Sequence, residues 1–279
     1  MKRRTFLHTT LATGSLAALA ASTSNASADD KTTMSRQLIE LRTYLLRADK
    51  RAAFDAYASQ ALIPALNRLG VKSVGAFHES PAPTPADAKP PEPKPTPAAF
   101  LLIPYHDVGQ MSAVTSALTN DSAYQQATAE YLSVPATDPV YERIESSLFL
   151  AFETMPQLVA PAEKANSPKP TIFNLRIYES HNEAAAKKKI EMFNQGEIAI
   201  FRRVGLTPVF FGEALVGARL PNLTYLLAFQ DEPARTQAWN TFRNDPEWLK
   251  LKAIPEYEDK RIVSKITNKL LAPTEYSQI

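Results

Sequence analysis

The chain contains no cysteine among its 279 residues. This absence excludes disulfide bonds, a thiolate nucleophile, cysteine-ligated zinc and iron–sulfur clusters. A strong charge of either sign is also missing, because 31 basic side chains are matched by 29 acidic ones. A balanced chain does not form the basic surface by which nucleic acids and anionic membranes are generally held. We therefore expect a fold held together by packing, with no nucleic-acid partner.

Local catalytic signatures are also missing. The sequence has no glycine-rich phosphate loop, HExxH helix, nucleophile elbow or EF-hand loop. Beyond the first 28 residues there are three histidines, His78, His106 and His181, and they are not spaced as a metal cluster on one element. We predict no metal site and no cofactor, and the catalytic residues are unknown. Haem bound through one of these histidines is the alternative.

The first 28 residues have the pattern of an export signal. Arg3 and Arg4 precede a mildly apolar stretch, and Ala26, Ser27 and Ala28 form a small-residue cleavage site. The apolar stretch is shorter than the ~18 residues that a membrane span requires. The arginine pair resembles the twin-arginine export motif, with an ordinary secretory signal as the alternative. We expect cleavage after Ala28 and a mature protein in the periplasm or outside the cell.

The remaining chain carries the same plan twice. Matching segments are ELRTY (40–44) and NLRIY (174–178), NRLG (67–70) and RRVG (202–205), and FLLIPYHD (100–107) and YLLAFQDE (225–232). Self-similarity of this kind indicates a duplicated structural unit. We predict one domain over residues 37–159 and a second over residues 171–273.

Two proline-rich segments separate these units. Residues 81–97 hold eight of the 22 prolines and interrupt the first copy. Proline has no backbone N–H for a strand ladder, so this insertion is predicted to be a surface loop. Residues 160–170, which also contain prolines, are predicted to be the linker between the copies.

Hydrophobic periodicity in each copy predicts the order strand, helix, strand, strand, helix, strand. Gly70 and Gly205 are expected to end the first helix of each copy, and Pro64 to kink that of the first copy. Asp245 and Pro246 are expected to begin a further short helix. The strand and helix order is that of the ferredoxin-like βαββαβ unit, an α+β fold whose sheet has helices on one face only. The open face needs a partner sheet, and the other copy is the nearest one. We expect the two sheets to pack within one chain as a dimeric α+β barrel. Pairing of each copy with another chain, and a homo-oligomer, are the alternatives.

These residues resemble the NIPSNAP family. The resemblance rests on ELRTY and NLRIY, on the apolar strand YLLAF, and on DPEW at residues 245–248, which the first copy replaces with DSAY. It implies the dimeric α+β barrel superfamily, which includes monooxygenases, haem-binding and haem-degrading proteins and isomerases. NIPSNAP domains have no agreed catalytic motif, so the resemblance implies a fold more than an activity.

The first strand of each copy carries the most informative polar residues. The two sets are Glu40, Arg42 and Tyr44, and Asn174, Arg176 and Tyr178, each on one face of its strand. We expect this face to point between the sheets, where an arginine must be paired or must meet an anionic ligand. One interpretation is a pocket for a small anionic or aromatic ligand. The other is that Arg42 pairs with Glu40 or a facing acid and the tyrosines fill the barrel.

Other candidates are weaker. His78 and Glu213 end the second strand of each copy and are expected to line one mouth or a surface rim. Trp239 and Trp248 have the spacing of core residues, and the run 187–189 of lysines that of a solvated helix face. We predict an exported small-molecule-binding or interaction protein. The alternative is a monooxygenase-like or haem-linked enzyme that uses the space between the sheets.

Overall fold

The computed structural model describes residues 35–80, 96–161 and 169–279. The predicted export signal and most of the proline-rich insertion lie outside these residues. The strands are β1 (Leu38–Leu46), β2 (Gly75–Ser80), β3 (Ala98–Tyr105), β4 (Tyr141–Ala151), β5 (Ile172–Glu179), β6 (Thr207–Val216), β7 (Asn222–Phe229) and β8 (Lys265–Pro273).

Helices follow β1 and β3 in the first copy and β5 and β7 in the second. The helices are α1 (Arg51–Tyr57), α2 (Ile63–Arg68), α3 (Val108–Asn120), α4 (Ser122–Leu132), α5 (Glu183–Met192), α6 (Ile198–Arg203), α7 (Glu232–Arg243), α8 (Pro246–Lys252), the 3₁₀ turn η3 (Pro255–Tyr257) and α9 (Asp259–Ile262). The predicted α+β element order is therefore observed in both copies, which we call the first half and the second half.

Local sequence signals set the helix ends. Asp245 caps α8 by accepting hydrogen bonds from the backbone N–H groups of Glu247 and Trp248, and Pro246 is the first helical residue, as predicted. Gly70 and Gly205 follow the first helical segment of each half with φ angles of 85° and 88°. This left-handed conformation costs glycine least, which confirms the predicted helix ends.

A π-helical turn interrupts the first long helix of each half at the same place. It is η1 (Ala58–Leu62) between α1 and α2, and η2 (Phe193–Glu197) between α5 and α6. Pro64 follows η1 and was expected to kink this helix. Because the second half has the same π turn without a proline, the proline is not its general cause. Such turns are rare in proteins, and many of those that occur lie at functional sites.

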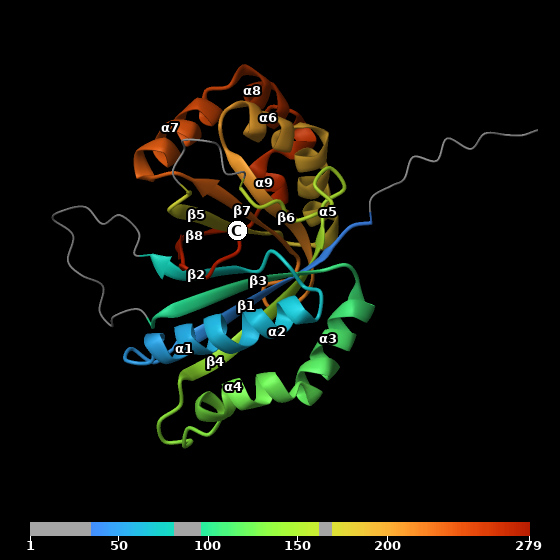
Figure 1. The fold of residues 1–279 in the computed structure, drawn as a ribbon. Helices are drawn as coiled ribbons and strands as arrows, with labels where there is room; N and C mark the ends of the chain where they lie inside the picture. Colours follow the sequence, from blue (N-terminus) through green and yellow to red (C-terminus); the bar gives the residue numbers. More distant parts are fainter. Residues whose placement is uncertain (1–34, 81–95, 162–168) are drawn as a thin grey trace, which may run out of the picture. The chain divides into compact units, whose positions relative to one another are not determined.

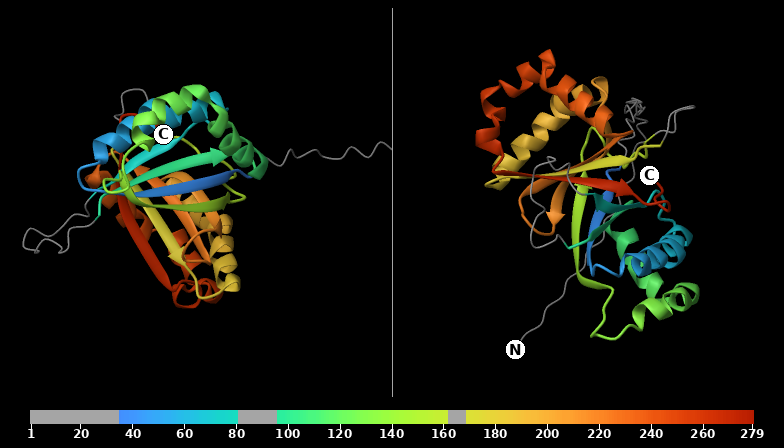
Figure 2. Two further views of the ribbon diagram at one scale, coloured as in Figure 1. Left: turned by 90° about the horizontal axis from the view of Figure 1, so that it is seen from below. Right: turned by 90° about the vertical axis from the view of Figure 1, so that its left-hand side faces the viewer.

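The eight strands form one closed antiparallel barrel in the order β1-β3-β2-β8-β5-β7-β6-β4. Pairing of β2 with β8 and of β4 with β6 joins the halves, so the barrel closes within one chain. The helices of the first half lie on one side of the strands and those of the second half on the opposite side, as two further views also show (Figures 1 and 2).

Apolar side chains from both sheets fill the barrel. Those buried there are Ile39, Leu41, Phe77, Ala98, Phe100, Leu102, Phe149, Ala151, Phe173, Leu175, Val209, Phe210, Leu226, Ala228 and Leu271. Because strand side chains alternate between faces, the polar residues between Ile39 and Leu41, and between Phe173 and Leu175, point the other way. The expectation that the two polar sets face the inter-sheet space is therefore wrong.

Two further clusters form where each sheet meets its helices. Trp239 and Trp248 belong to that of the second half and are 8% and 9% exposed, which confirms them as core residues. Residues 274–279 follow β8 and lie along the first half, where the backbone N–H of Gln278 donates to the carbonyl of Val74. Within the described residues, no helix is long and apolar enough to span a membrane.

Candidate functional site

The polar faces of β1 and β5 form the floor of two clusters, one between each sheet and its own helices. Tyr44 lies in the helix-facing core of the first half and Tyr178 in that of the second. Arg42 and Arg176, two residues earlier on the same strand faces, are half-buried. The candidate residues are thus separated by the whole barrel and do not form one shared site.

In the first half, Arg42 is neutralised by its own strand. Its Nε donates to Oε1 of Glu40 at 2.9 Å and its Nη2 donates to Oε2 at 3.0 Å. Glu40 also accepts from the hydroxyls of Ser146 on β4 at 2.7 Å and Tyr105 on β3 at 3.2 Å. We call these four residues the Arg42 cluster. The Glu40 carboxylate accepts four hydrogen bonds in all, which agrees with the interpretation that Arg42 pairs with Glu40.

Burial and the arginine act on Glu40 in opposite directions. Burial alone would raise the pKa of Glu40, but the Arg42 charge and hydrogen bonds from Arg42, Ser146 and Tyr105 outweigh it, and the pKa is lowered. Burial raises the pKa of Tyr105. Glu40 is therefore an ionised structural acceptor at neutral pH and has no free lone-pair direction for a ligand acid.

Tyrosines fill the space beneath the helices of the first half. Tyr57 and Tyr131 stack with ring centroids 3.9 Å apart, and the hydroxyls of Tyr57 and Tyr124 are 3.1 Å apart. The ring of Tyr44 meets that of Tyr141 edge-on at 5.7 Å. These contacts make Tyr44 a packing residue.

In the second half, Asn174 takes the place of Glu40, so no carboxylate lies beside Arg176 on the helix-facing side of β5. Its Nη2 donates to the hydroxyl of Tyr178 at 3.2 Å, and its guanidinium carbon lies 4.8 Å from the ring centroid of Trp239 on α7. The hydroxyl of Tyr225 on β7 donates to that of Tyr178, also at 3.2 Å. The guanidinium is therefore held by an aromatic face and by a neutral hydroxyl.

Among the residues that the structure describes, three buried polar atoms around Arg176 have no hydrogen-bond partner. They are Nε of Arg176 itself, Oδ1 of Asn174 and Nε1 of Trp239. The amide nitrogen of Asn174 donates to the Asn268 side chain at 2.5 Å and to the Lys269 carbonyl at 3.2 Å, whereas its side-chain oxygen is buried without a hydrogen-bond partner in the described residues. Buried polar groups are nearly always hydrogen-bonded, so three unpartnered atoms on residues around one arginine require an explanation.

A buried ion pair lies on the helices that cover Arg176 and Tyr178, in α5 and η2. Nζ of Lys189 on α5 is 3.3 Å from Oε2 of Glu197 in η2, and both side chains are 2% exposed. Rings of Tyr178, Phe193 and Trp248 surround the ammonium at 5.1 to 5.8 Å. Burial raises the pKa of Glu197 although Lys189 opposes it.

Lys189 was predicted to be solvated with its neighbours, and this is wrong. Lys187 is exposed, whereas Lys189 is buried, because helix positions two apart lie on different faces of the helix. A lysine run hides this difference in the sequence. We call Asn174, Arg176, Tyr178, Lys189, Glu197, Tyr225 and Trp239 the Arg176 cluster.

The Arg176 cluster borders solvent along β8. Asn268, opposite Arg176 in the strand register, is exposed, and Ile266 nearby is 41% exposed. Arg176 itself is half-buried. The helices of the second half therefore leave the edge of the cluster next to β8 uncovered.

His78 and Glu213 are not brought together. They lie on β2 and β6, which are four strands apart in the eight-stranded barrel. Nε2 of His78 is 2.7 Å from Oδ1 of Asp55 on α1, which also accepts from the hydroxyl of Tyr276 at 2.6 Å. Glu213 lines a cavity of about 340 Å³ with the start of α5 and the turn before β7. The expectation of a common mouth is therefore wrong.

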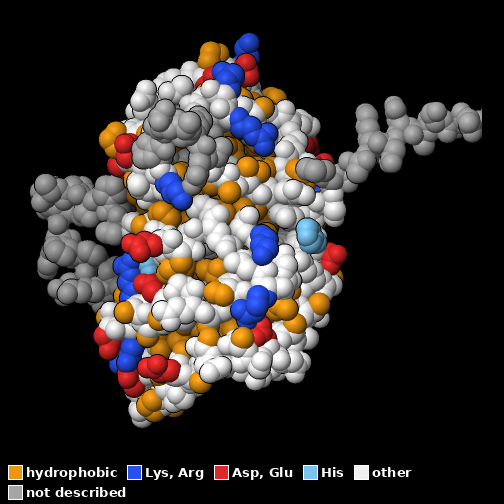
Figure 3. Space-filling view, in the orientation of Figure 1, with side chains coloured by type: hydrophobic (Ala, Val, Ile, Leu, Met, Phe, Trp, Pro, Cys, Tyr) orange, Lys and Arg blue, Asp and Glu red, His pale blue; other side chains and the backbone are white. Residues whose placement is uncertain are grey.

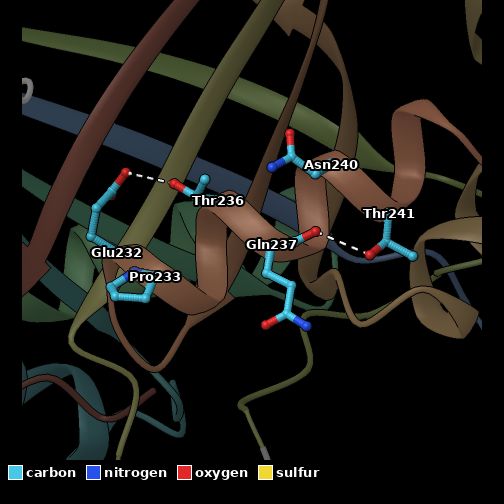
Figure 4. A pocket seen from close by; sticks show the side chains of 6 residues that line it. All are labelled: Glu232, Pro233, Thr236, Gln237, Asn240 and Thr241. Atoms are coloured by element: carbon cyan, nitrogen blue, oxygen red, sulfur yellow. Dashed lines mark hydrogen bonds between the residues drawn. The ribbon is translucent and has the colours of Figure 1, made fainter.

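A further hollow of about 580 Å³ lies on the outer face of α7 (Figure 4). It is lined by Glu232, Pro233, Thr236, Gln237, Asn240 and Thr241. Trp239 and Phe242 occupy the opposite, buried face of this helix. On the face seen in Figure 3, basic and acidic side chains are interspersed among neutral and apolar ones.

The described residues contain no group of three or more potential metal ligands. None of the seven residues of the Arg176 cluster is a histidine, and His106 and His181 are exposed. These residues do not fit a histidine-ligated haem.

Comparisons with known proteins agree with this fold. Two solved structures, each described as a "putative monooxygenase", are similar over most of the chain. The protein from Fusobacterium nucleatum is 11% identical with a TM-score of 0.56, covering 86% of this chain and 93% of that one. The protein from Lactobacillus acidophilus is 9% identical with a TM-score of 0.53, covering 85% and 94%. No curated protein matches the sequence.

A second group of matches concerns one half only. An uncharacterised NIPSNAP-like domain protein from Burkholderia xenovorans is 22% identical with a TM-score of 0.35, covering 39% of this chain and 90% of that one. The family model of NIPSNAP matches residues 173–278. This range includes all seven residues of the Arg176 cluster. The second half of this chain is thus similar to the NIPSNAP family, on a barrel fold shared with the two larger structures.

Proposed function

We propose that the protein binds a small anionic molecule in the Arg176 cluster, between the second sheet and its helices. The observation that carries this proposal is a set of three buried atoms that find no hydrogen-bond partner in residues 35–80, 96–161 and 169–279, namely Asn174 Oδ1, Arg176 Nε and Trp239 Nε1. Two donors beside a fixed positive charge suit the acceptor group of a small acid, and Asn174 Oδ1 can accept from any donor that the ligand also carries.

The surroundings of the cluster support a small ligand. The guanidinium remains charged throughout the pH range of folded proteins, and Trp239 and Tyr178 hold it in one place. The half-buried position lowers the competition from water for a charge-assisted hydrogen bond. We also propose that the two halves are tandem ferredoxin-like units of NIPSNAP type, which their common element order supports.

Tryptophan signals provide a direct test. The chain has two tryptophans, Trp239 and Trp248, so the two indole N–H resonances report on the second half alone. Titration with acetate, benzoate, phosphate and sulfate is expected to shift the Trp239 resonance with at least one anion. R176Q should weaken that binding by about tenfold or more, since hydrogen bonds to charged groups contribute about 1.5–3 kcal/mol. R202Q changes an exposed arginine on α6 and is the matched control. No response to any anion would contradict the proposal.

A monooxygenase-like enzyme is the second candidate. The description of the two larger neighbours supports it, together with the buried Tyr178 and Tyr225 hydroxyls beside Arg176. Oxygen uptake in the presence of small phenols tests this candidate. Uptake that Y225F leaves unchanged would place the reaction elsewhere, and no uptake would favour binding alone.

A further inference from the structure

Arg42 and Arg176 occupy equivalent places in the two halves. Arg42 stands opposite Leu101 on β3 and Ser146 on β4, and Arg176 stands opposite Tyr225 on β7 and Asn268 on β8. In both strands the arginine directly follows a leucine, and its side chain lies on the helix-facing side of the strand. The internal duplication therefore offers a comparison of one arginine in two environments.

The two environments differ at the residue two positions earlier. In the first half it is Glu40, whose carboxylate accepts from Nε and Nη2 of Arg42 at 2.9 and 3.0 Å. In the second half it is Asn174, and Nε of Arg176 has no hydrogen-bond partner within the described part of the chain. The donor atom that is left unsatisfied in one half is thus the atom that meets a carboxylate oxygen in the other.

We infer that the first half carries its own ligand in the form of Glu40, and that the ligand of the Arg176 cluster is a monocarboxylic acid. This inference rests on the proposed function and names its ligand class. The Glu40 carboxylate shows the required group, a planar pair of oxygens that matches the guanidinium fork.

The charges in the Arg176 cluster favour a monoanion over a phosphate dianion. Two cations, Arg176 and Lys189, share the region with the carboxylates of Glu197 and Asp259, which lie 3.3 and 3.5 Å from Lys189. Lys189 is thereby committed to the protein's own acids. These two cations and two carboxylates balance, so a monoanion adds one negative charge to the region, whereas a phosphate dianion adds two and is less favourable.

Access also differs between the clusters in the required direction. Glu40 is 3% exposed and fills the first site from within. Asn174 is buried, but Asn268 beside it is exposed on β8. A carboxylate can therefore reach Arg176 across β8, with its organic part next to the Trp239 ring.

The first experiment supplies the missing carboxylate to the second half. N174E is expected to abolish the benzoate-induced shift of the Trp239 resonance, with an affinity loss of about tenfold or more, and to raise the melting temperature in the absence of ligand. N174Q, which has the same length without the charge, should do neither. Benzoate binding by N174E at wild-type affinity would overturn the inference, as would a melting temperature no higher than that of N174Q.

The second experiment removes the carboxylate of the first half. E40A should lower the melting temperature, and formate should restore part of it in a concentration-dependent way, whereas sodium chloride at equal ionic strength should not. The wild type should show no formate effect of this size in the first half, whose site Glu40 fills. Equal rescue by sulfate would overturn the carboxylate assignment. If E40A does not fold, N174E and N174Q decide the question.

The two proposals fail in different ways. If the wild type binds no anion, the proposed function is wrong, and the melting temperatures of N174E and N174Q still show whether Arg176 accepts a carboxylate. If the wild type binds phosphate or sulfate but not benzoate or acetate, anion binding stands and the monocarboxylate inference is wrong.

Discussion

Lys189 and Glu197 form a buried ion pair with 3.3 Å between Nζ and Oε2. The pair joins α5 to the π-helical turn η2 and lies directly above the aromatic rings of the second half. Each charge is tolerated because the other is present, since an isolated charge at this depth would be strongly destabilising.

Breaking this pair from one side should be costly. K189M is expected to lower the free energy of unfolding by about 3–5 kcal/mol, because it leaves the Glu197 carboxylate buried without a cation. K187M, on the exposed face of the same helix, should change stability by less than about 0.5 kcal/mol. Urea denaturation measures both, and equal stability of the two variants would contradict the buried position of Lys189.

The deficit of K189M should also depend on pH. Burial raises the pKa of Glu197, so this carboxyl takes up a proton more readily in the folded state than in the unfolded state. A raised pKa contributes stability that is present at low pH and lost as pH rises. The difference between K189M and the wild type should therefore shrink as the pH is lowered from 7 toward 5. A constant difference would indicate that Glu197 is not the group responsible.

His78 should make folding sensitive to acid. Burial lowers the pKa of His78, and the opposing effect of Asp55 does not compensate for it. A lowered pKa contributes stability that is present above the ordinary value of about 6.5 and lost as pH falls below it. H78Q should lose less stability than the wild type between pH 7.5 and 5.5, whereas H181Q, which changes an exposed histidine, should follow the wild type. A wild-type slope in H78Q would rule out this assignment.

Closure of the barrel between β4 and β6 can be tested at Gly212. A Cβ atom at this position would lie 2.6 Å from Cβ of Phe149, which belongs to the barrel interior. G212A is expected to cost about 1–3 kcal/mol through overpacking. T207V, at the exposed start of the same strand, is the control. An unchanged urea midpoint for G212A would mean that the strands do not approach so closely.

We propose that the mature protein is exported by the twin-arginine route. A fusion of residues 1–30 to a reporter that folds before export should reach the periplasm only if Arg3 and Arg4 are intact. Replacement of both by lysine should retain the reporter in the cytoplasm, since the signal is recognised through the arginine pair. Equal export of the lysine variant would favour the ordinary secretory route.

For the duplicated strands β1 and β5, the sequence predicted the positions of the strands but not the direction of their polar faces. The alternation around Arg42 and Arg176 predicted two strands with one polar face each, and the structure places β1 and β5 over these residues. Alternation does not state which face meets the helices. The predicted direction was wrong because both faces contain large apolar or aromatic residues, and only the positions of the neighbouring strands decide which set fills the barrel.

Other features of the site were beyond local reasoning. The sequence pattern allows Arg42 to pair with Glu40, because residues two apart share a strand face. The burial of Lys189 and the approach of Trp239 to Arg176 depend on where α5 and α7 cross the second sheet. Those crossings result from packing between segments more than sixty residues apart in the case of Arg176 and Trp239, and no short pattern encodes them.

The sequence by itself determined the two-fold repetition, the element order of each half, the helix ends at Gly70, Gly205 and Asp245, and the absence of disulfides. These features follow from periodicity and backbone preferences, which act over a few residues. Tertiary structure alone decided between closure of the barrel within one chain and pairing with another chain. It alone decided that the barrel interior is apolar and that one of two equivalent arginines has no carboxylate beside it. The physical reason is that burial and hydrogen-bond satisfaction depend on neighbours brought together by the complete fold.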